Sequence, residues 1–365
     1  MIDFYRTQGF DIPDQPLKAG IFGASGTTGV EMARLLTGHP CFELVFATSR
    51  EFAGQSLRVV DPAAPDFELI APEAVMLDGI DVIFTCLPHG HSAQCVEMCH
   101  EAGPVVVDLS GDLRLRDAAL HDKTYGSERN QDLIDRCVYG LTETMREQLA
   151  GAKIVSNPGC YPTCVGLGIF PLAQAGKLNG TIVANAVSGV SGAGRKANAT
   201  THFCSAYGDV RPYNVGRKHR HVAEMEQSLA DWMAADAGNI NLIFNPHLVP
   251  LERGMLATMV VELPGMSLDE VHELYAERYD AEPFIDLLQA GETARIRTVA
   301  NTNLVSIGLA KAGEDHFVIT SAIDNVLKGA AGQALQNANL VFGLPETLGL
   351  GATVAAPMKE MAGAQ

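Results

Sequence analysis

The sequence predicts a doubly wound α/β domain followed by an α+β domain with a mixed sheet, and three observations carry this prediction. The first half alternates short apolar runs with helical stretches, which is typical of a parallel sheet with crossover helices. After about residue 155 the apolar runs become longer and richer in β-branched residues, which favours a mixed sheet. The chain has 365 residues, whereas a single core stops growing near about 250–300 residues, so we expect two domains.

The first half provides strands buried on both faces. Short, continuous apolar runs of this kind are typical of parallel strands covered by helices on each side. We expect strands at residues 17–22, 42–47, 81–87 and 105–109, with a helix at residues 30–36.

A further strand is expected at residues 152–155, just before the texture changes. The second half is then expected to contain longer strands, at residues 177–189, 256–263 and 317–320, and one loop. Residues 187–199 are crowded with Gly and Ser, and this composition indicates a loop.

The C-terminal segment at residues 323–343 has the apolar spacing of a helix, and Asp324 is suited to be its N-cap. Gly329 and Gly332 inside this helix each cost about 1 kcal/mol relative to Ala. We therefore expect them to allow a close approach to another backbone or to a ligand.

Composition narrows the class of protein. Hydrophobic residues make up 47% and charged residues 19%, as in an ordinary folded protein, and the formal net charge is −17. Such an acidic surface repels nucleic acid and anionic membranes, so neither is expected as a partner. The N-terminus has no secretory pattern and no apolar run reaches about 18 residues, so we expect a cytoplasmic protein with its eight cysteines reduced.

A glycine-rich turn follows the first strand, at Gly23-Ala24-Ser25-Gly26-Thr27-Thr28-Gly29. Glycines let a backbone turn tightly and approach a pyrophosphate, whose charge the free N–H groups of the following helix can hold. The spacing is G-x-x-G-x-x-G rather than the commoner G-x-G-x-x-G, but the flanking strand and helix favour nucleotide binding over a purely structural turn. The first domain is therefore predicted to be a Rossmann domain.

The end of the second strand indicates which dinucleotide binds. NAD enzymes usually place Asp or Glu here to accept from the ribose 2′-OH, whereas this chain has Ser49 and Arg50. A hydroxyl and a guanidinium suit a 2′-phosphate, so we expect NADP, although Glu51 follows immediately.

The most specific pattern is Ser156-Asn157-Pro158-Gly159-Cys160-Tyr161-Pro162-Thr163, in which a strand enters a Pro-Gly turn and then a helix. A cysteine at a helix N-terminus feels the positive end of the helix dipole, so we expect a lowered pKa and a reactive thiolate. Such a thiolate can attack an acyl carbon and form a thioester that then accepts hydride. Cys164, one helical turn later, is expected to be a core residue.

A basic segment supplies a candidate proton carrier. His219 and His221 lie among Arg217, Lys218 and Arg220 in a chain that is otherwise acidic. Imidazole relays protons near neutral pH, and the positive charge suits phosphate and carboxylate groups. These histidines, like the pair His89 and His91, could instead bind a metal, but no recognisable metal spacing is completed, so no metal is expected. A solvated basic face is the other alternative.

With these residues in view, the sequence resembles the N-acetyl-gamma-glutamyl-phosphate reductase family, within the aspartate-semialdehyde dehydrogenase-like group. The resemblance extends from about residue 17 to residue 351. Besides the two turns above, it rests on motifs at residues 87–90, 107–112, 138–141, 188–195, 219–221, 246–250 and 324–334.

The resemblance implies a role for each matching residue. Cys160 would form the acyl-thioester, His221 would be its acid/base partner with His219 close by, and Glu224 would orient that histidine. Substrate anions would be held by Arg114 and Arg220, with Ser191 and Asn157 also at the substrate. The cofactor site would comprise Gly23, Ser25, Gly26, Thr27, Thr28, Gly29, Ser49, Arg50, Pro88, Gly192 and Asn325.

The resemblance also implies an organisation and an activity. Residues 1–159 would form the NADP-binding domain, residues 160–322 the catalytic and dimerisation domain, and residues 323–365 a helix that returns to the first domain. The activity implied is NADPH-dependent reduction of an N-acetyl-γ-glutamyl phosphate to the semialdehyde in arginine biosynthesis, by a homo-oligomer. After the second histidine, Val222 and Ala223 replace the Thr-Pro that is usual in the family, and Met225 replaces the common Ile. These departures put the start of the helix that follows His221 in doubt.

Three other functions stay open at this point. Aspartate-semialdehyde dehydrogenase performs the same chemistry on aspartyl phosphate. A carrier-protein-linked homologue of lysine biosynthesis must dock an acidic carrier, which a chain of net charge −17 disfavours. A non-catalytic Rossmann protein could sense NADP and regulate a partner.

Overall fold

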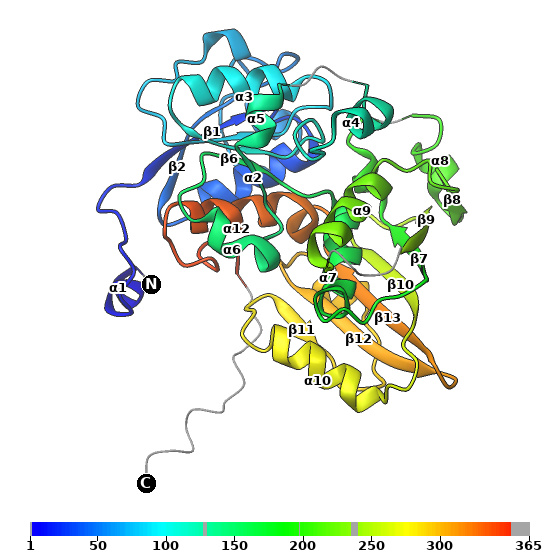
Figure 1. The fold of residues 1–365 in the computed structure, drawn as a ribbon. Coiled ribbons are helices and arrows are strands. Elements are labelled where there is room, and N and C mark those ends of the chain that lie inside the picture. The colour runs from blue at the N-terminus through cyan, green and yellow to red at the C-terminus, as the bar shows by residue number, and fades with distance from the viewer. Residues whose placement is uncertain (1, 127–129, 197, 235–239, 352–365) are drawn as a thin grey trace.

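A computed structural model describes residues 2–126, 130–196, 198–234 and 240–351. Two sheets organise these residues (Figure 1). The fold class predicted from the sequence is confirmed: a doubly wound parallel sheet is followed by a mixed sheet.

The first sheet has the order β2-β1-β3-β4-β6-β5, and all its pairs are parallel. Every position of β3 and β4 is buried, as expected for strands with helices on both faces. The strands are β1 (Leu17–Phe22), β2 (Phe42–Ala47), β3 (Val82–Thr85), β4 (Val105–Asp108), β5 (Cys137–Tyr139) and β6 (Ile154–Ser156).

Helices connect these strands. The bounds are α1 (Ile2–Thr7), α2 (Thr27–Thr37), α3 (Ser92–Glu101), α4 (Ala118–Thr124), α5 (Gln131–Asp135) and α6 (Thr142–Leu149), with 3-10 turns at Leu57–Val59 and Pro72–Ala74. The predicted strand and helix starts in this half agree with the structure to within a few residues, because the short apolar runs coincide with the buried parallel strands.

The second sheet has the order β11-β12-β13-β10-β7-β9-β8, and it mixes parallel and antiparallel pairs. Alternate residues of β10 are buried, so one face of this sheet packs on helices. The strands are β7 (Thr181–Ser188), β8 (Arg211–Pro212), β9 (Asn241–Leu248), β10 (Met255–Glu262), β11 (Ile285–Leu287), β12 (Val305–Ala312) and β13 (His316–Ile323).

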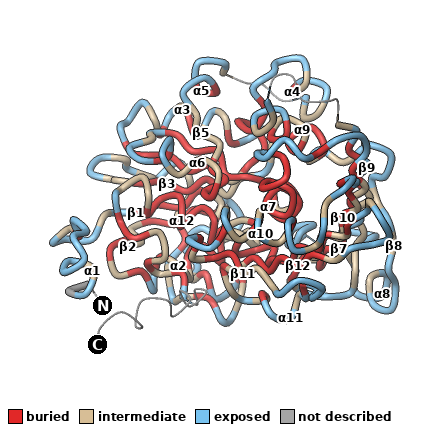
Figure 2. Tube along the Cα trace, turned by 60° about the horizontal axis from the view of Figure 1, so that its bottom comes forward, coloured by how far each residue is buried: buried red, intermediate tan, exposed pale blue. Residues whose placement is uncertain are grey.

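The helices of this half are α7 (Cys160–Gln174), α8 (Phe203–Ala206), α9 (His221–Trp232), α10 (Leu268–Tyr279), α11 (Ile296–Val299) and α12 (Gly332–Val341), with a 3-10 turn at Val190–Ala193. Helix α7 is buried along almost its whole length and packs on α9, α10, β10 and β13. Figure 2 shows α7 and α12 among the buried parts of the molecule, whereas α1 and α8 are exposed. Cys164 lies fully buried in this core, as predicted.

The C-terminal segment forms a helix, but not a uniform one. Asp324 Oδ1 accepts hydrogen bonds from the N–H groups of Val326 and Leu327, so it binds the start of this segment as predicted, although Val326 rather than Asp324 holds the N-cap position. The first turns at Leu327–Ala331 are π-helical, and α12 begins only at Gly332. Ala334, Leu335 and Ala338 belong to the core of the first sheet, so the chain returns there after completing the second sheet (Figure 1).

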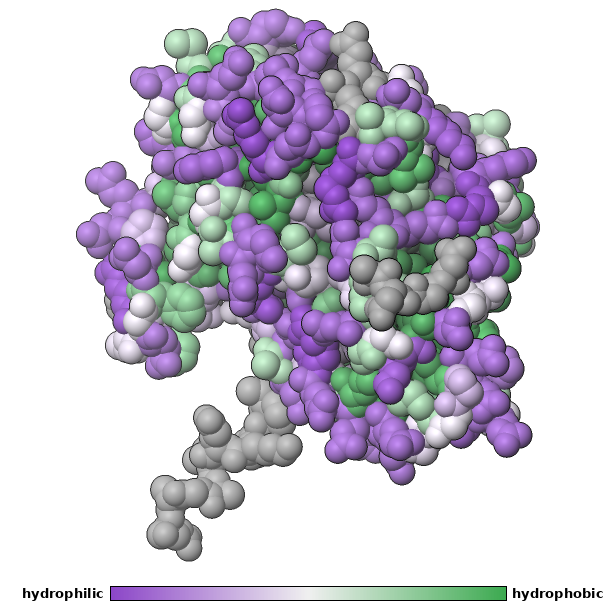
Figure 3. All heavy atoms as spheres, viewed as in Figure 1, coloured by the Kyte–Doolittle hydropathy of each residue, from purple (hydrophilic) through white to green (hydrophobic). Residues whose placement is uncertain are grey.

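The surface seen in Figure 3 is largely hydrophilic, with hydrophobic patches between the polar side chains. This agrees with the excess of acidic residues in the sequence. No helix among the described residues is long and apolar enough to cross a membrane.

Candidate active site

A cavity of about 1510 Å³ lies where the two sheets meet, and both halves of the chain line it. The first half contributes the glycine turn after β1, the end of β2 and the loop after β3. The second half contributes the start of α7, the turn at 188–196 and the segment before α9. Nearly all of the predicted site residues therefore meet around one space, although they come from separate parts of the sequence.

The glycine turn forms one end of this cavity. Gly23 has φ +86, and a Cβ there would lie 2.7 Å from the carbonyl oxygen of Cys86. Only glycine fits such a position. Helix α2 then begins with Gly26 as its N-cap and with no side-chain cap. Its first N–H groups therefore remain available to an anion.

Gly29 was predicted to contact the cofactor, but it lies outside the cavity lining. The cavity is lined by Gly23, Ser25, Gly26, Thr27 and Thr28, whereas Gly29 is buried beneath the turn. A Cβ on Gly29 would clash with the backbone of Gly23 and Ala24. Gly29 therefore lets α2 pack closely on the turn, and its assignment as a cofactor contact is corrected to a packing role.

The end of β2 brings Ser49 and Arg50 to the cavity wall. The Ser49 hydroxyl donates to Ser25 Oγ at 3.0 Å, which links the two predicted cofactor segments. Arg50 is 78% exposed and pairs with Glu73 at 2.7 Å. Its guanidinium thus lies at the rim, partly neutralised by a carboxylate. Pro88 lines the same cavity from the loop after β3.

The nucleophile turn forms the deep part of the cavity. β6 ends at Ser156 and α7 begins at Cys160, with Gly159 as an N-cap that has no side-chain cap. The N–H of Asn157 bonds the carbonyl of Asp108 at 2.7 Å, and the N–H of Gly159 bonds Glu224 Oε1 at 2.8 Å. These bonds fix the backbone on which the Cys160 side chain sits.

The π-helical turn closes over Cys160. A Cβ on Gly329 would lie 2.8 Å from Cys160 Cβ, so only glycine allows this approach. The neighbouring Lys328 is fully buried, and its Nζ pairs with Glu143 Oε1 at 2.5 Å and with Gln336 Oε1 at 2.8 Å. The close approach predicted from Gly329 is confirmed, and the surface approached is the start of α7. Gly332 is also closely approached, but by the Asn303 side chain and the backbone of Leu327.

The surroundings of Cys160 do not favour the thiolate. Burial raises the pKa of the Cys160 thiol to about 11, against the opposing effects of Arg114 and of the Tyr161 N–H. The prediction of a lowered pKa is therefore wrong. The helix N-terminus does act in the expected direction, but loss of water around the sulfur outweighs it.

Arg114 and Glu224 form a buried pair beside the turn. Their side chains are 5% and 0% exposed, and Nη1 lies 3.4 Å from Oε2. Arg114 also donates from Nε to the carbonyl of Asn157 and from Nη2 to that of Leu109. The Tyr139 hydroxyl donates to Glu224 Oε1 at 2.8 Å. Arg114 lines the cavity, so a buried cation faces the space beside Cys160.

His221 is the first residue of α9 and touches the nucleophile turn. A Cβ on Gly159 would lie 2.6 Å from His221 Nε2, so the imidazole packs directly on the residue before Cys160. Burial holds the pKa of His221 well below its usual value, and the neighbouring His219 adds to this effect. Burial also lowers the pKa of His219 to about 4. Both imidazoles are therefore neutral near pH 7, and a neutral imidazole can accept a proton.

The predicted orientation of His221 by Glu224 is wrong. The carboxylate of Glu224 binds the Gly159 N–H, the Tyr139 hydroxyl and Arg114. His221 Nδ1 is buried and has no hydrogen-bond partner among the described residues. Glu224 thus holds the nucleophile turn and the cation rather than the imidazole.

Asn157 lines the cavity and also binds the C-terminal segment. Its side chain donates to the carbonyl of Ala330 at 3.1 Å and accepts from Asn337 Nδ2 at 3.1 Å. Its contact with a substrate stays a prediction. Asn157 ties the nucleophile turn to that segment.

Ser191, Gly192 and Asn325 lie together in the lining of the cavity. Asn325 Nδ2 donates to Ser191 Oγ at 2.9 Å, and its Oδ1 accepts from the N–H of Gly254 at 2.7 Å. Gly192 approaches Asn325 closely as well. Arg220 lies on the remaining side, with its guanidinium 5.5 Å from the centre of the Tyr125 ring.

Two residues that support the site were not assigned from the sequence. Tyr139 lies in a motif that the family resemblance includes, yet its bond to Glu224 spans 85 residues and leaves no local signal. Asp112 accepts from the N–H groups of Gly90, Ser92 and Ala93 and so fixes the loop that carries Pro88 and His89. Asp112 also lies in a motif that the family resemblance includes, at residues 107–112, but nothing in that motif indicates which N–H groups it binds.

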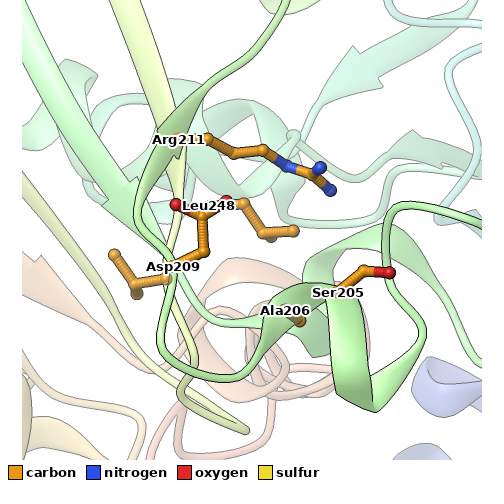
Figure 4. Close-up of a pocket in the computed structure, with 6 residues that line it drawn as sticks. Ser205, Ala206, Asp209, Arg211 and Leu248 are labelled. Atoms are coloured by element: carbon orange, nitrogen blue, oxygen red, sulfur yellow. The ribbon is translucent and has the colours of Figure 1, made fainter.

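Neither a metal site nor, near α8, a cavity large enough for a ligand is found among the described residues. No group of three or more His, Cys, Asp or Glu side chains in that part of the chain is placed to hold a metal ion. A shallow hollow near α8 and β9 is lined by Ser205, Asp209, Arg211 and Leu248, but it has almost no room for a ligand. Figure 4 shows the Arg211 guanidinium extending away from Asp209.

Comparison with known proteins agrees with this fold. The family model for the semialdehyde dehydrogenase NAD binding domain matches residues 18–152, and that for the semialdehyde dehydrogenase dimerisation domain matches residues 160–325. Among solved structures, aspartate semialdehyde dehydrogenase II from Vibrio cholerae has a TM-score of 0.70 at 18% identity, covering 89% of this chain and 98% of that one. Aspartate semialdehyde dehydrogenase with NADP from Candida albicans has a TM-score of 0.65 at 19% identity, covering 90% and 99%.

Fold and domain matches together define an oxidoreductase of the semialdehyde dehydrogenase type. More similar in sequence is the N-acetyl-gamma-glutamyl-phosphate reductase of Halorhodospira halophila, 44% identical over 92% of this chain and 98% of the relative. That of Desulforudis audaxviator is 43% identical over the same shares. The chain belongs to the N-acetyl-gamma-glutamyl-phosphate reductase family, as its sequence motifs indicated.

Proposed function

We propose that this protein reduces N-acetyl-γ-glutamyl phosphate to N-acetylglutamate 5-semialdehyde and releases phosphate, with NADPH as the reductant, in arginine biosynthesis. The single observation that carries the proposal is the position of Cys160. Its sulfur lies at the start of α7 in the cavity that the glycine turn also lines, so a nucleophile and a dinucleotide site share one space. The relatives that cover nearly the whole chain bear the corresponding name.

The thiol and the imidazole would act as a neutral pair. His221 is neutral near pH 7, so it would take the Cys160 proton as the sulfur attacks the acyl carbon. The new S–C bond forms while the C–O bond to phosphate breaks, leaving a thioester on Cys160. A thiol pKa of about 11 favours this concerted transfer over a preformed thiolate.

Arg114 and Arg220 would hold the anionic groups of the substrate. Arg114 has a buried counter-ion in Glu224, which keeps its charge and its position before any substrate arrives. Preorganised cations of this kind stabilise charge that develops on a leaving phosphate. The ring centres of His219 and His221 lie 4.7 Å apart. The neutral His219 would therefore help to hold the His221 imidazole in position.

The residues at the far end of the cavity fit a dinucleotide. The uncapped start of α2 and the glycine at φ +86 form a cradle that a Cβ would fill. Thr27 and Thr28 would add hydroxyl donors to the pyrophosphate, and Ser49 and Arg50 would hold the 2′-phosphate. When bound, the cofactor supplies the hydride for reduction of the acyl group. Gly192 and Asn325 would border the reacting end.

The assembly is proposed to be a homo-oligomer, a dimer or tetramer. The match of residues 160–325 to a dimerisation domain supports this proposal. Light scattering of the purified protein tests it, and a monomeric mass at assay concentrations would contradict it.

The deciding experiment is the reverse assay with N-acetylglutamate semialdehyde, phosphate and NADP. We expect phosphate-dependent reduction of NADP, and a comparable or better rate with aspartate semialdehyde would overturn the substrate assignment. Cys160→Ser should reduce turnover by at least about 10³-fold, because the nucleophile is lost, while NADPH binding stays intact. If the variant kept its biological function, a regulator would be the better description.

A further inference from the structure

Tyr125 occupies a place beside the cavity that the motif at residues 107–112 creates for it. The residue follows α4, and its ring lies over Gly111. A Cβ on Gly111 would lie 2.5 Å from the ring and 2.7 Å from the phenol oxygen, so any side chain there would displace the tyrosine. The glycine in this motif therefore makes room for the phenol.

Cationic and imidazole groups of the cavity surround this ring. The Arg220 guanidinium lies over one side, 5.5 Å from the ring centre, at a distance typical of a cation–π contact. The His89 ring lies 5.3 Å away, and its Nδ1 accepts from the N–H of Gly111 at 2.6 Å. Arg114 is close enough that its charge favours ionisation of the phenol. Arg114, Arg220 and His89 all line the cavity.

The phenol oxygen itself is buried, yet it has no hydrogen-bond partner of normal geometry among the described residues. Burial raises the pKa of Tyr125 to about 12, with the negative charge of Glu224 adding to the effect. The hydroxyl therefore keeps its proton near neutral pH and needs an acceptor. Guanidinium groups have none to offer. A buried, unpaired donor is unfavourable by about 1–3 kcal/mol, so an anion between these groups would satisfy it.

We propose that Tyr125 is a substrate-binding residue, whose hydroxyl donates to the same anionic group that Arg114 and Arg220 hold. The ligand chemistry is an anionic oxygen, carried either by the phosphate or by the carboxylate of the substrate. The ring in turn keeps Arg220 over the cavity. This inference rests on the proposed function for the identity of the substrate, but not for the presence of an anion site.

Tyr125→Phe tests the hydroxyl while it keeps the ring under Arg220. We expect the KM for the substrate that carries the bound anionic group to rise at least about ten-fold, which is the scale of a hydrogen bond to a charged group. The kcat should change less than about three-fold. In the reverse assay, a raised KM for phosphate identifies the phosphate. A raised KM for the semialdehyde alone identifies the carboxylate.

A matched control separates binding from folding. Tyr275 is buried in α10 and donates to the carbonyl of Gly168 at 2.6 Å. Tyr275→Phe should lower the melting temperature and leave each KM unchanged, because it removes a satisfied hydrogen bond away from the cavity. Tyr125→Phe should show the opposite pattern, since its hydroxyl has no partner to lose.

A second readout is independent of turnover. Inorganic phosphate should slow alkylation of Cys160 by iodoacetamide in the wild-type protein and protect Tyr125→Phe only at about ten-fold higher concentration. If the variant loses phosphate protection and the wild-type protein has no reductase activity, the anion site is supported and the proposed function is rejected. If Tyr125→Phe has the same KM values and the same phosphate protection as the wild-type protein, the inference is overturned and the ring has only a packing role.

Discussion

Two helix starts face the same cavity, and they use the same local geometry for different purposes. Helix α2 begins after β1 and α7 begins after β6, each with an extended glycine N-cap and no side-chain cap. Around α2 the turn is open to the cavity, and hydroxyls of Ser25, Thr27 and Thr28 surround it. Around α7 the turn is enclosed by Arg114, Glu224, His221 and Gly329.

The difference shows that surroundings, more than helix polarity, decide what a helix N-terminus does. The open turn can accept a large anion such as a pyrophosphate, whose charge the free N–H groups hold. The enclosed turn loses water, so burial raises the pKa of Cys160 despite the dipole. One turn is suited to bind a charge and the other to hold a neutral nucleophile in place.

The largest expected effect comes from removing the charge that holds the enclosed turn. Glu224→Gln leaves the buried Arg114 without a counter-ion, which should lower the free energy of unfolding by about 3 kcal/mol. The matched control is Glu226→Gln on the same helix, whose exposed pair with Arg217 should contribute less than about 1 kcal/mol. Chemical denaturation measures the free energy of unfolding of both variants. Equal losses would contradict the claim that burial makes the pair of Glu224 and Arg114 more important for stability.

The same variant has a pH signature. In the wild-type protein, Cys160 alkylation should accelerate with pH up to the thiol pKa of about 11, because only the thiolate reacts. The negative charge of Glu224 disfavours the thiolate, so Glu224→Gln should move the inflection to lower pH and speed alkylation at pH 8. An inflection that stays in place or rises would show that this charge does not act on the sulfur.

Gly329→Ala probes the packing of the enclosed turn. The added methyl would lie 2.8 Å from Cys160 Cβ and displace the nucleophile, so we expect kcat to fall on the order of 10²-fold while NADPH binding is retained. Gly38→Ala is the control, because its nearest new contact is an ordinary 3.7 Å from the carbonyl of Arg34. Wild-type turnover in Gly329→Ala would mean that Cys160 needs no such close support.

A smaller and opposite pattern is expected at the open turn. Gly23→Ala places a side chain at φ +86, a conformation unfavourable by about 1–2 kcal/mol, so NADPH should bind about ten-fold more weakly. Cys160 alkylation should not change. Gly54→Ala has a similar φ but no atom within 4 Å, and it lies away from the turn, so its NADPH affinity should match the wild type. Titration by fluorescence distinguishes these outcomes.

The exposed rim should affect one nucleotide only, and the smallest effect of all is expected at Glu73. Arg50→Ala should weaken NADPH about ten-fold and NADH hardly at all, because only NADPH has a 2′-phosphate to lose a charged hydrogen bond. Glu73→Gln releases Arg50 from its pair and should strengthen NADPH binding about two-fold. Equal weakening of both nucleotides by Arg50→Ala would remove the assignment of Arg50 to the 2′-phosphate.

Local patterns were enough for most of the first domain and for the nucleophile turn. The runs at 17–22, 42–47 and 105–109 became β1, β2 and β4. Every position of β4 is buried, as a continuous apolar run predicts, whereas β2 at the edge of the sheet is partly exposed. By contrast β9, with its Asn, Pro and His residues, was not recognised as a strand, since its pairing with β7 and β8 comes from distant segments.

The sequence by itself determined the two glycine turns, the cysteine that follows one of them and the basic segment with its two histidines. Glycines that allow a tight turn or a close contact, and nucleophilic side chains, are visible as single residues, so they can be recognised without a structure. Tertiary structure alone decided that Glu224 binds Gly159 and Arg114 rather than His221, that Asn157 binds the C-terminal segment, and that the Cys160 thiol is neutral. Hydrogen-bond partners and solvent exclusion depend on segments 65 to 173 residues apart, and only the folded chain brings these segments together.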